Sequence, residues 1–246
     1  MISATIITLN EENKISRAIK SLKGLADEII VVDSGSTDKT VVTADNLGAK
    51  VFFHEFDNFA NQKNWAVSKA KGNWILSLDA DEEILPALAE EIKEAVKNDR
   101  YVGYLIPRKN FILEKEIKHS RWSPDSHVWL WKKNCGKWTG DVHEEVVVSG
   151  KVGSLKGSKI HNSHDTVSSF MKANNFYSTL EARVLFKKNI KFSFARMFRE
   201  SLFEFFIRFF YKKGFLDGSK GFILAYIMGI YKLTVWIKLW ELEQKK

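Results

Sequence analysis

Short apolar runs alternate with helical patterns along the first hundred residues, and this alternation constrains the fold more than any other feature of the sequence. The apolar runs predict strands at 4–9, 28–32, 50–53 and 74–78. Apolar residues recur at helical spacing between these runs, and a further helix is expected at 86–97. Strands that alternate with helices in this way form a parallel sheet with right-handed crossovers. The sequence therefore predicts an α/β fold.

Polar residues follow three of the four predicted strands. Asn10 and Glu11 come after the first strand, Asp33 follows the second, and Asp79 follows the fourth. In open parallel sheets, ligands bind outside the carboxyl ends of the strands, so we expect these residues along one edge. The sequence thus predicts one binding site that is built from three strand ends.

The fourth strand leads into an acidic stretch, Asp79-Ala-Asp-Glu-Glu83. Because side chains alternate along a strand, Asp79 and Asp81 can point the same way. Two carboxylates in this position suit a Mg²⁺ or Mn²⁺ ion that also holds a diphosphate. The alternative is an acidic loop that opens the helix at Pro86, with the acids complementing the positive end of the helix dipole.

A turn, Asp33-Ser-Gly-Ser-Thr-Asp38, follows the second strand. Its first carboxylate can accept hydrogen bonds from a nucleobase N–H or a ribose hydroxyl. The alternative is an ordinary strand-to-helix turn in which Asp or Ser caps the helix. The chain contains neither G-x-G-x-x-G nor G-x-x-x-x-G-K-[ST], so neither a dinucleotide-binding fold nor a P-loop enzyme is supported. A nucleotide held without those loops, beside a carboxylate-bound metal, indicates a nucleotide-sugar.

Length and cysteine content set broad limits. The 246 residues suffice for one large domain, or one domain with an appendage. The single cysteine, Cys135, excludes an internal disulfide framework and a multi-cysteine zinc site, and it fits a reducing compartment. The first residues lack a basic stretch followed by a long apolar segment, so we expect no signal peptide.

The positive charge is concentrated at the end of the chain. Residues 1–186 hold 25 Lys and Arg against 25 Asp and Glu, whereas residues 187–246 hold 13 against 5. The body therefore carries no basic excess of the kind that nucleic-acid binding requires, and we expect no nucleic-acid partner.

The basic end is also rich in aromatic residues. Nine of the 18 Phe lie in residues 192–215, and a second apolar helix is expected at 222–240. Neither segment is an uninterrupted apolar span of about 20 residues, so a transmembrane helix is not expected. Basic amphipathic helices with Phe and Trp are typical of an anchor on an anionic membrane surface. The alternative is that these helices pack on the domain or form an oligomer interface.

The second half of the body has shorter elements. Strands are predicted at 101–108, 127–131 and 146–148, and a charged connection without clear periodicity at 110–118. The pair His161 and His164 favours a structural role or a phosphate contact, because zinc would need more ligands at defined spacing.

Several motifs together resemble the family 2 glycosyltransferases of the GT-A fold. They are Thr8-Leu-Asn-Glu-Glu12, Val31-Val-Asp-Ser-Gly-Ser-Thr-Asp-Lys-Thr40, Gln62-Lys-Asn64 and Leu76-Ser-Leu-Asp-Ala-Asp-Glu-Glu83. More narrowly, the chain is similar to the short glucosyltransferases that extend the inner core of lipopolysaccharide or lipooligosaccharide, including Gly140-Asp-Val-His-Glu-Glu145 and Gly214-Phe-Leu-Asp-Gly218.

The resemblance implies a domain organisation. It implies a Rossmann-like, mostly parallel GT-A sheet with a helical extension at the C-terminus. The catalytic domain would span 1–165, with a nucleotide-sugar half at 1–100 and an acceptor half at 101–165. Residues 166–246 would form the basic amphipathic extension.

The resemblance also implies roles for individual residues on the donor side. Asp33 would bind the uracil or its ribose, Asp79 would contact the ribose or the metal, and Asp81 would ligate the metal. Lys63 would lie against the nucleotide or diphosphate; its alternative is a solvated helix lysine. The residues that the resemblance assigns to nucleotide-sugar binding are Thr8, Asn10, Glu11, Asp33, Lys63 and Asp79.

Inverting glycosyl transfer needs a base for the acceptor hydroxyl and a cation for the departing diphosphate. Glu144 is the candidate base, because it ends a Trp-x-Gly-x-x-His-Glu segment that matches the subgroup's pattern. Asp141 and Glu145 are rivals, and His143 is a candidate to orient the acceptor or join the metal shell. Glu144 could instead be a surface strand residue, and Glu144 and Glu145 would face opposite sides.

The predicted function is an inverting, Mg²⁺- or Mn²⁺-dependent transfer of a sugar, with UDP-glucose as the expected donor, to a lipopolysaccharide or lipooligosaccharide core glycolipid. The enzyme would lie peripherally on the cytoplasmic face of the membrane, and an oligomer is possible. The alternatives are another surface glycan, a polyprenyl-phosphate acceptor, or a catalytically silent nucleotide-sugar binder at the membrane. A phosphatase is disfavoured because Glu83 stands where such sites carry a small hydroxyl or apolar residue.

Overall fold

The computed structural model describes residues 1–140 and 144–245, which form two compact units. Unit 1 comprises Met1–Lys109 and Ser126–His161, and unit 2 comprises Asn110–Asp125 and Asn162–Lys246. Two strands continue from one unit into the other: β6, Gly103–Ile112, and β12, Lys159–His164. Each unit has its own hydrophobic core.

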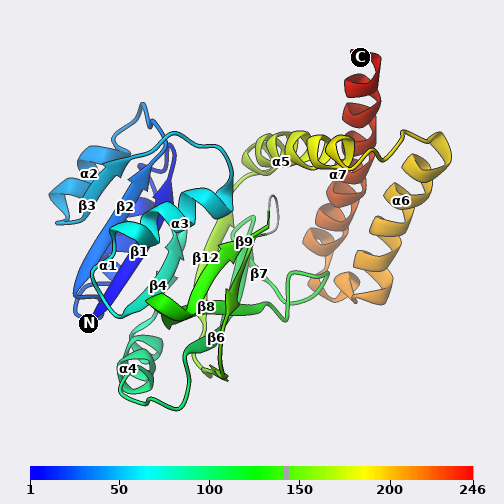
Figure 1. The fold of residues 1–246 in the computed structure, drawn as a ribbon. Helices are drawn as coiled ribbons and strands as arrows, with labels where there is room; N and C mark the ends of the chain where they lie inside the picture. Colours follow the sequence, from blue (N-terminus) through cyan, green and yellow to red (C-terminus); the bar gives the residue numbers. More distant parts are fainter. Residues whose placement is uncertain (141–143, 246) are drawn as a thin grey trace. The chain divides into compact units, whose positions relative to one another are not determined.

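Unit 1 consists of a large sheet and a separate two-stranded sheet, with helices packed beside them (Figure 1). Its other strands are β1 (Ile2–Thr8), β2 (Glu28–Asp33), β3 (Lys50–Phe53), β4 (Trp74–Asp79), β5 (Glu82–Ile84), β8 (Ser126–Lys132), β9 (Gly136–Thr139), β10 (Glu145–Val148) and β11 (Val152–Ser154). Its helices are α1 (Ile15–Ser21), α2 (Thr40–Asn46), α3 (Phe59–Lys69), α4 (Pro86–Ala95) and a 3₁₀ turn, Lys133–Cys135.

The sheet is parallel through its first four strands, in the order β3-β2-β1-β4, as the strand–helix alternation predicts. Beyond β4 it becomes mixed, because β8 is antiparallel to β4 and β6 is antiparallel to β8. Strand β1 lies between β2 and β4, with Thr8 opposite Asp33 and Ile7 opposite Asp79. The carboxyl ends of these three strands therefore meet at one edge.

Local sequence explains where these elements begin and end. Strands β1, β2 and β4 are buried along almost their whole length, as expected for a parallel sheet covered on both faces. Helix α3 begins at Asn58, whose side chain accepts the backbone N–H of Asn61 at 2.9 Å. Helix α4 begins with Pro86, which needs no N–H at this position. Gly48, with φ of +86°, ends the turn after α2.

Five strands form where the sequence pattern predicts none: β5, β7, β9, β11 and β12. Residues 82–84 form β5 and pair with β12, with Glu82 opposite His161. Strand β6 extends to Ile112, and β7 (Lys115–Ile117) pairs with it where we expected an irregular connection. The buried positions of β5 and β12 include charged residues, so an apolar pattern could not reveal them.

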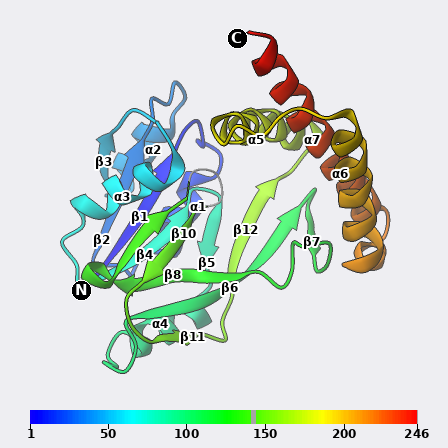
Figure 2. The same cartoon turned by 45° about the vertical axis from the view of Figure 1, so that its right-hand side comes forward.

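Unit 2 is largely helical (Figure 2). Helix α5 (Val167–Lys187) begins with a capping box between Thr166 and Ser169. Helices α6 (Phe194–Phe206) and α7 (Ser219–Gln244) are connected by a π-helical turn and a 3₁₀ turn and pack against each other. Among the described residues, α7 alone is long and apolar enough to cross a membrane by length and composition, and half of its most apolar stretch is buried.

Candidate functional site

The site begins at the shared edge of β1, β2 and β4. Thr8, Asp33 and Asp79 occupy the ends of these strands, as the strand-end rule predicts. Thr8 is 6 % exposed, and its buried hydroxyl has no hydrogen-bond partner among the described residues. A buried hydroxyl without a partner is unfavourable, so this group is suited to a ligand that supplies one.

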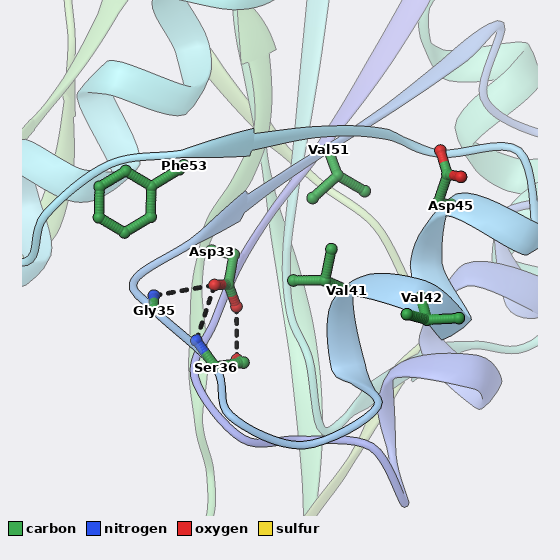
Figure 3. Close-up of a pocket in the computed structure, with 8 residues that line it drawn as sticks. All are labelled: Asp33, Gly35, Ser36, Val41, Val42, Asp45, Val51 and Phe53. Carbon is green, nitrogen blue, oxygen red and sulfur yellow. Dashed lines mark hydrogen bonds between the residues drawn. The ribbon is translucent and has the colours of Figure 1, made fainter.

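The Asp33 carboxylate organises the turn that follows β2. It accepts the backbone N–H groups of Gly35 and Ser36, each at 2.8 Å, and the Ser36 hydroxyl (Figure 3). Gly35 has φ of +100°, a conformation that favours glycine. A carboxylate offers about four lone-pair sites, so Asp33 keeps capacity for a further donor from a ligand.

The loop after β1 is bonded to this turn. The Asn10 side chain accepts the Thr37 N–H at 2.9 Å, and the Asn10 N–H donates to the Ser36 hydroxyl at 2.8 Å. The Glu11 N–H donates to the Thr40 hydroxyl at 2.8 Å. Asn10 and Glu11 therefore brace the Asp33 turn through bonds within unit 1.

A pocket of about 500 Å³ opens beside Asp33. Figure 3 shows side chains from the Asp33 turn, α2 and β3 around it. Its lining residues are Asp33, Gly35, Ser36, Val41, Val42, Asp45, Val51 and Phe53. Apolar walls with a few polar groups are typical of small-molecule sites and suit a flat heterocyclic ring. Asp45 and Phe53 were not predicted from the sequence. Phe53 could have been, because it ends β3 and ligands of such sheets bind at strand ends.

Asp79 and Asp81 each have a cationic partner. Asp79 Oδ1 lies 3.0 Å from Lys63 Nζ, and Asp81 Oδ2 lies 3.3 Å from His161 Nε2 and 4.0 Å from Lys14 Nζ. Burial alone would raise the pKa of both aspartates. Neighbouring basic side chains, Lys63 foremost for Asp79 and His161 for Asp81, outweigh burial and hold the pKa of each aspartate below its usual range. Both carboxylates are therefore ionised at neutral pH.

Lys63 connects Asp79 to the candidate base. Its side chain is buried, and Nζ lies 2.9 Å from Glu144 Oε1 as well as 3.0 Å from Asp79. The ammonium also lies 4.4 Å from the centre of the Trp138 ring. Burial would lower the Lys63 pKa, but the two carboxylates more than reverse this and raise it. Lys63 is thus a buried, paired cation and not a solvated helix lysine.

The structure separates Glu144 from Glu145. The Glu144 side chain is 16 % exposed and paired with Lys63, whereas the Glu145 side chain is 69 % exposed, 3.9 Å from His127 Nδ1. Asp141 and His143, the other candidates in this segment, lie outside the described residues.

A second buried network, which the sequence analysis did not identify, supports Asp79. Glu82 is fully buried; its Oε2 accepts the Asp79 N–H at 2.9 Å and pairs with Lys159 Nζ. Arg108 lies 3.3 Å from the other Glu82 oxygen, and Lys159 lies over the Trp129 ring. Burial lowers the pKa of Lys159 to about 8, although Glu82 opposes the shift. Glu82 therefore connects the backbone of Asp79, at the start of the turn that carries Asp81, to the buried Lys159.

The donor set can be tested against the predicted metal. Within residues 1–140 and 144–245, no group of three or more His, Cys, Asp or Glu is arranged to hold a metal. Mg²⁺ and Mn²⁺ in phosphate-transfer sites are often held by only one or two carboxylates, with substrate phosphates completing the shell. Asp81 and His161 supply a carboxylate oxygen and an imidazole nitrogen 3.3 Å apart, with Asp79 two residues away. These residues fit a divalent ion that arrives with a diphosphate.

Comparison with known proteins gives a consistent result. The model of the family described as glycosyl transferase family 2 matches residues 3–206. An uncharacterized glycosyltransferase of Rickettsia typhi is 35 % identical, with 99 % of this chain and 88 % of the relative covered. The lipopolysaccharide core biosynthesis glycosyltransferase LpsC of Rhizobium meliloti is 28 % identical, with 98 % and 92 % covered.

The solved structures support the fold. Glucosyl-3-phosphoglycerate synthase from Mycobacterium tuberculosis, in complex with Mn²⁺, UDP and glucosyl-3-phosphoglycerate, superposes with a TM-score of 0.50 at 18 % identity. The match covers 78 % of this chain and 81 % of that chain. The predicted GT-A fold, with its mixed sheet and C-terminal helices, is confirmed.

Proposed function

The chain belongs to glycosyltransferase family 2, and from this premise we propose that it moves glucose from UDP-glucose to a lipopolysaccharide or lipooligosaccharide core glycolipid, with inversion at the anomeric carbon. The observation that carries this proposal is that unit 1 holds both a pocket of about 500 Å³ beside Asp33 and the Asp79–Lys63–Glu144 bridge, whose central lysine is buried. The similarity to LpsC, a lipopolysaccharide core biosynthesis glycosyltransferase, supports the acceptor class.

The donor side follows from the strand ends. The Asp33 carboxylate would accept a hydrogen bond from the uracil N–H or a ribose hydroxyl, and the unpaired Thr8 hydroxyl would gain a partner. Asn10 and Glu11 would keep the Asp33 turn in place. That UDP occupies the structure of the Mycobacterium tuberculosis synthase supports a uridine donor.

Asp81 and His161 would hold a Mg²⁺ or Mn²⁺ ion, and Asp79 would be a further candidate ligand. When bound, such an ion neutralises charge on the departing diphosphate. The ionised state of Asp79 and Asp81 prepares both oxygens for that role, since ligands must be deprotonated.

The chemical step needs a base on the acceptor side. Glu144 would take the proton of an acceptor hydroxyl while that oxygen attacks the anomeric carbon, and the bond from this carbon to the diphosphate would break, with UDP leaving with the electron pair. Glu144 is suited to this role because its side chain is 16 % exposed and pairs with Lys63, which also pairs with Asp79. Asp141 and His143 would orient the acceptor or join the metal shell, and Asp141 is the alternative base.

We assign residues 1–165 to the catalytic domain, with a nucleotide-sugar half at 1–100 and an acceptor half at 101–165. Residues 166–246 would attach the enzyme to the inner face of the membrane. Along α6 and the following turn, Phe194, Phe198, Leu202, Phe206 and Phe210 recur every fourth residue, and each is more than half exposed. Such an apolar stripe suits the lipid interface.

Basic residues beside this stripe favour an anionic lipid surface over a second copy of the chain. Arg196, Arg199, Lys212 and Lys213 are all exposed. A symmetric dimer through the stripe would bring these cations close to their own copies, which is unfavourable. Anionic headgroups would instead pair with them.

The decisive experiment measures the thermal stability of the protein with UDP, UDP-glucose, UDP-galactose and UDP-N-acetylglucosamine, each with and without Mn²⁺. Binding to the folded state raises the apparent melting temperature. We expect UDP-glucose to raise the melting temperature in the presence of Mn²⁺. We also expect the protein to transfer the sugar to lipopolysaccharide truncated to its inner core. Transfer only to polyprenyl phosphate or another glycan would reassign the acceptor, and donor binding without transfer would favour a silent binder.

A further inference from the structure

Three consecutive residues of α3 reach three different parts of the site. The Gln62 amide donates to Ser34 Oγ at 2.8 Å and to the His54 carbonyl at 3.0 Å. The Asn64 amide donates to the Trp138 carbonyl at 2.9 Å and accepts the Trp138 N–H at 3.0 Å. Because successive helical residues point about 100° apart, one turn of α3 can contact both the Asp33 turn and strand β9.

Lys63 lies between these two anchors. We propose that Lys63 is a positioning residue that couples the donor carboxylate Asp79 to Glu144, instead of a cation reserved for the diphosphate of the donor. This inference rests on the proposed function, because it assumes that Glu144 acts as the base.

Charge and burial are the first argument. Lys63 is 4 % exposed, and a buried cation is stable only when it is paired. An ammonium has three N–H donors, and the two carboxylates account for two of them. Asp79 and Glu144 both lie within 3.0 Å of the same nitrogen. Without this cation, two carboxylates would face each other in a poorly solvated place and repel.

The connection to β9 is the second argument. Lys63 Nζ lies over the Trp138 ring, and the backbone of Trp138 is bonded to Asn64 in the same helical turn. Strand β9 pairs with β10, with Thr139 opposite Glu145, so the residue after Glu144 is fixed by the same hairpin. Helix α3 therefore holds the Glu144 carboxylate through its side-chain ion pair and through the strand beside it.

The two possible roles of Lys63 predict different losses. A diphosphate-binding lysine would contribute to UDP affinity and act independently of Glu144. A positioning lysine would contribute to turnover through Glu144, so the two mutational effects would not add. The distinction can be measured with a double-mutant cycle.

The test compares Lys63→Met, Lys63→Arg, Glu144→Gln and the double variant Lys63→Met/Glu144→Gln with the unmodified chain. Lys69→Met is the matched control, since Lys69 is an exposed lysine of the same helix that lies over Trp65. The readouts are UDP affinity in Mn²⁺ by calorimetry and UDP release from UDP-glucose with truncated lipopolysaccharide.

We expect Lys63→Met to lower kcat by about 100-fold or more while UDP affinity changes by less than about threefold. The double variant should be within about twofold of Glu144→Gln alone. Lys63→Arg, which keeps the charge, should recover at least about tenfold of the lost rate. A loss of UDP affinity of about tenfold or more, together with multiplicative effects on kcat, would overturn the proposal.

Hydrogen exchange gives a readout that does not depend on turnover. Removing the bridge in Lys63→Met should speed amide exchange in β10. Lys63→Arg keeps the charge and should restore slow exchange, which separates loss of the bridge from poor folding of the methionine variant. Unchanged exchange in β10 in both variants would contradict the proposal. If the unmodified chain and Lys69→Met release no UDP, the proposed function fails, and exchange together with UDP affinity still decides the role of Lys63.

Discussion

At the scale of single residues, the Glu28 carboxylate shows how a buried charge can stabilise this sheet. It accepts hydrogen bonds from Ser3 Oγ, the Lys71 N–H and Lys50 Nζ, at 2.6, 2.6 and 2.7 Å. Burial would raise its pKa, but these three donors reverse the effect and lower it to about 2. Because the folded pKa lies below the unfolded value, the stabilisation is complete above about pH 4.5 and disappears as the pH falls toward 2.

We therefore expect Glu28→Gln to lower the free energy of unfolding by about 3 kcal/mol at pH 7, and by less than half as much at pH 3. Urea unfolding at the two pH values measures this difference. Glu90→Gln is the control, because Glu90 is exposed and pairs with Lys93 in the same helix. An equal loss at both pH values would show that the lost hydrogen-bond acceptor, and not the lost charge, accounts for the effect of the substitution.

Asp81 and His161 provide a test of the metal assignment. Asp81→Ala and His161→Ala should each weaken UDP binding in Mn²⁺ by about 10- to 100-fold, because each would remove one ligand of the ion. UDP binding without metal should stay unchanged in both variants, as measured by calorimetry. His127→Ala, whose imidazole lies near Glu145, is the control. Undiminished Mn²⁺-dependent UDP affinity in Asp81→Ala would show that Asp81 is not a ligand of the metal.

The assignment of the base can be tested on two adjacent glutamates. Glu144→Gln should reduce turnover by about 10²- to 10⁴-fold and leave UDP affinity nearly intact. Glu145→Gln should keep turnover within about twofold, since its side chain is exposed and separate from the Lys63 pair. Steady-state rates of UDP release distinguish the two variants. Near-normal turnover in Glu144→Gln would contradict its role as the base and favour Asp141.

At the scale of elements, the apolar pattern predicted the strands that contain an apolar run. Strands β1, β2 and β4 each contain such a run, although Glu28 and Asp33 are buried in β2. Strands β5 and β12 contain no such run, and a charged residue occupies one buried position of each: Glu82 in β5 and Lys159 in β12, which pair with each other. Pairing between distant charged residues leaves no periodic signal, so only the three-dimensional structure reveals it.

The candidate site divides in the same way. Asp33 and Asp79 could be predicted because they end strands that the strand–helix alternation predicts. The Lys63–Glu144 pair could not, because it depends on the hairpin of β9 and β10 returning to α3. The resemblance pointed to both residues without indicating that they touch.

Helix α6 is the element whose surface needs explanation, because its apolar stripe is exposed. Phe198→Ser/Phe206→Ser should reduce binding to anionic lipid vesicles by at least about tenfold, since each phenylalanine would lose roughly 1.5–3 kcal/mol of burial. Co-sedimentation with vesicles measures the change. Val147→Ser, at an exposed apolar position of β10, should have no effect. Equal binding by the stripe variant and the unmodified chain would exclude α6 from the contact.

At the scale of the whole molecule, the concentration of charge in residues 187–246 decides between a lipid surface and a second copy. Arg199→Glu/Lys212→Glu/Lys213→Glu should weaken binding to phosphatidylglycerol vesicles by about 100-fold, because each basic residue near an anionic surface contributes about 1 kcal/mol. Binding by the unmodified chain should also fall as salt rises from 0.05 to 0.5 M, since salt screens exposed charges. The same reversal should leave UDP affinity unchanged, because these residues lie in unit 2 and the donor pocket lies in unit 1. Equal binding to neutral phosphatidylcholine would show that the basic residues do not drive the lipid contact. A concentration-dependent dimer in sedimentation that the stripe variant abolishes would assign the exposed face to a second copy of the chain.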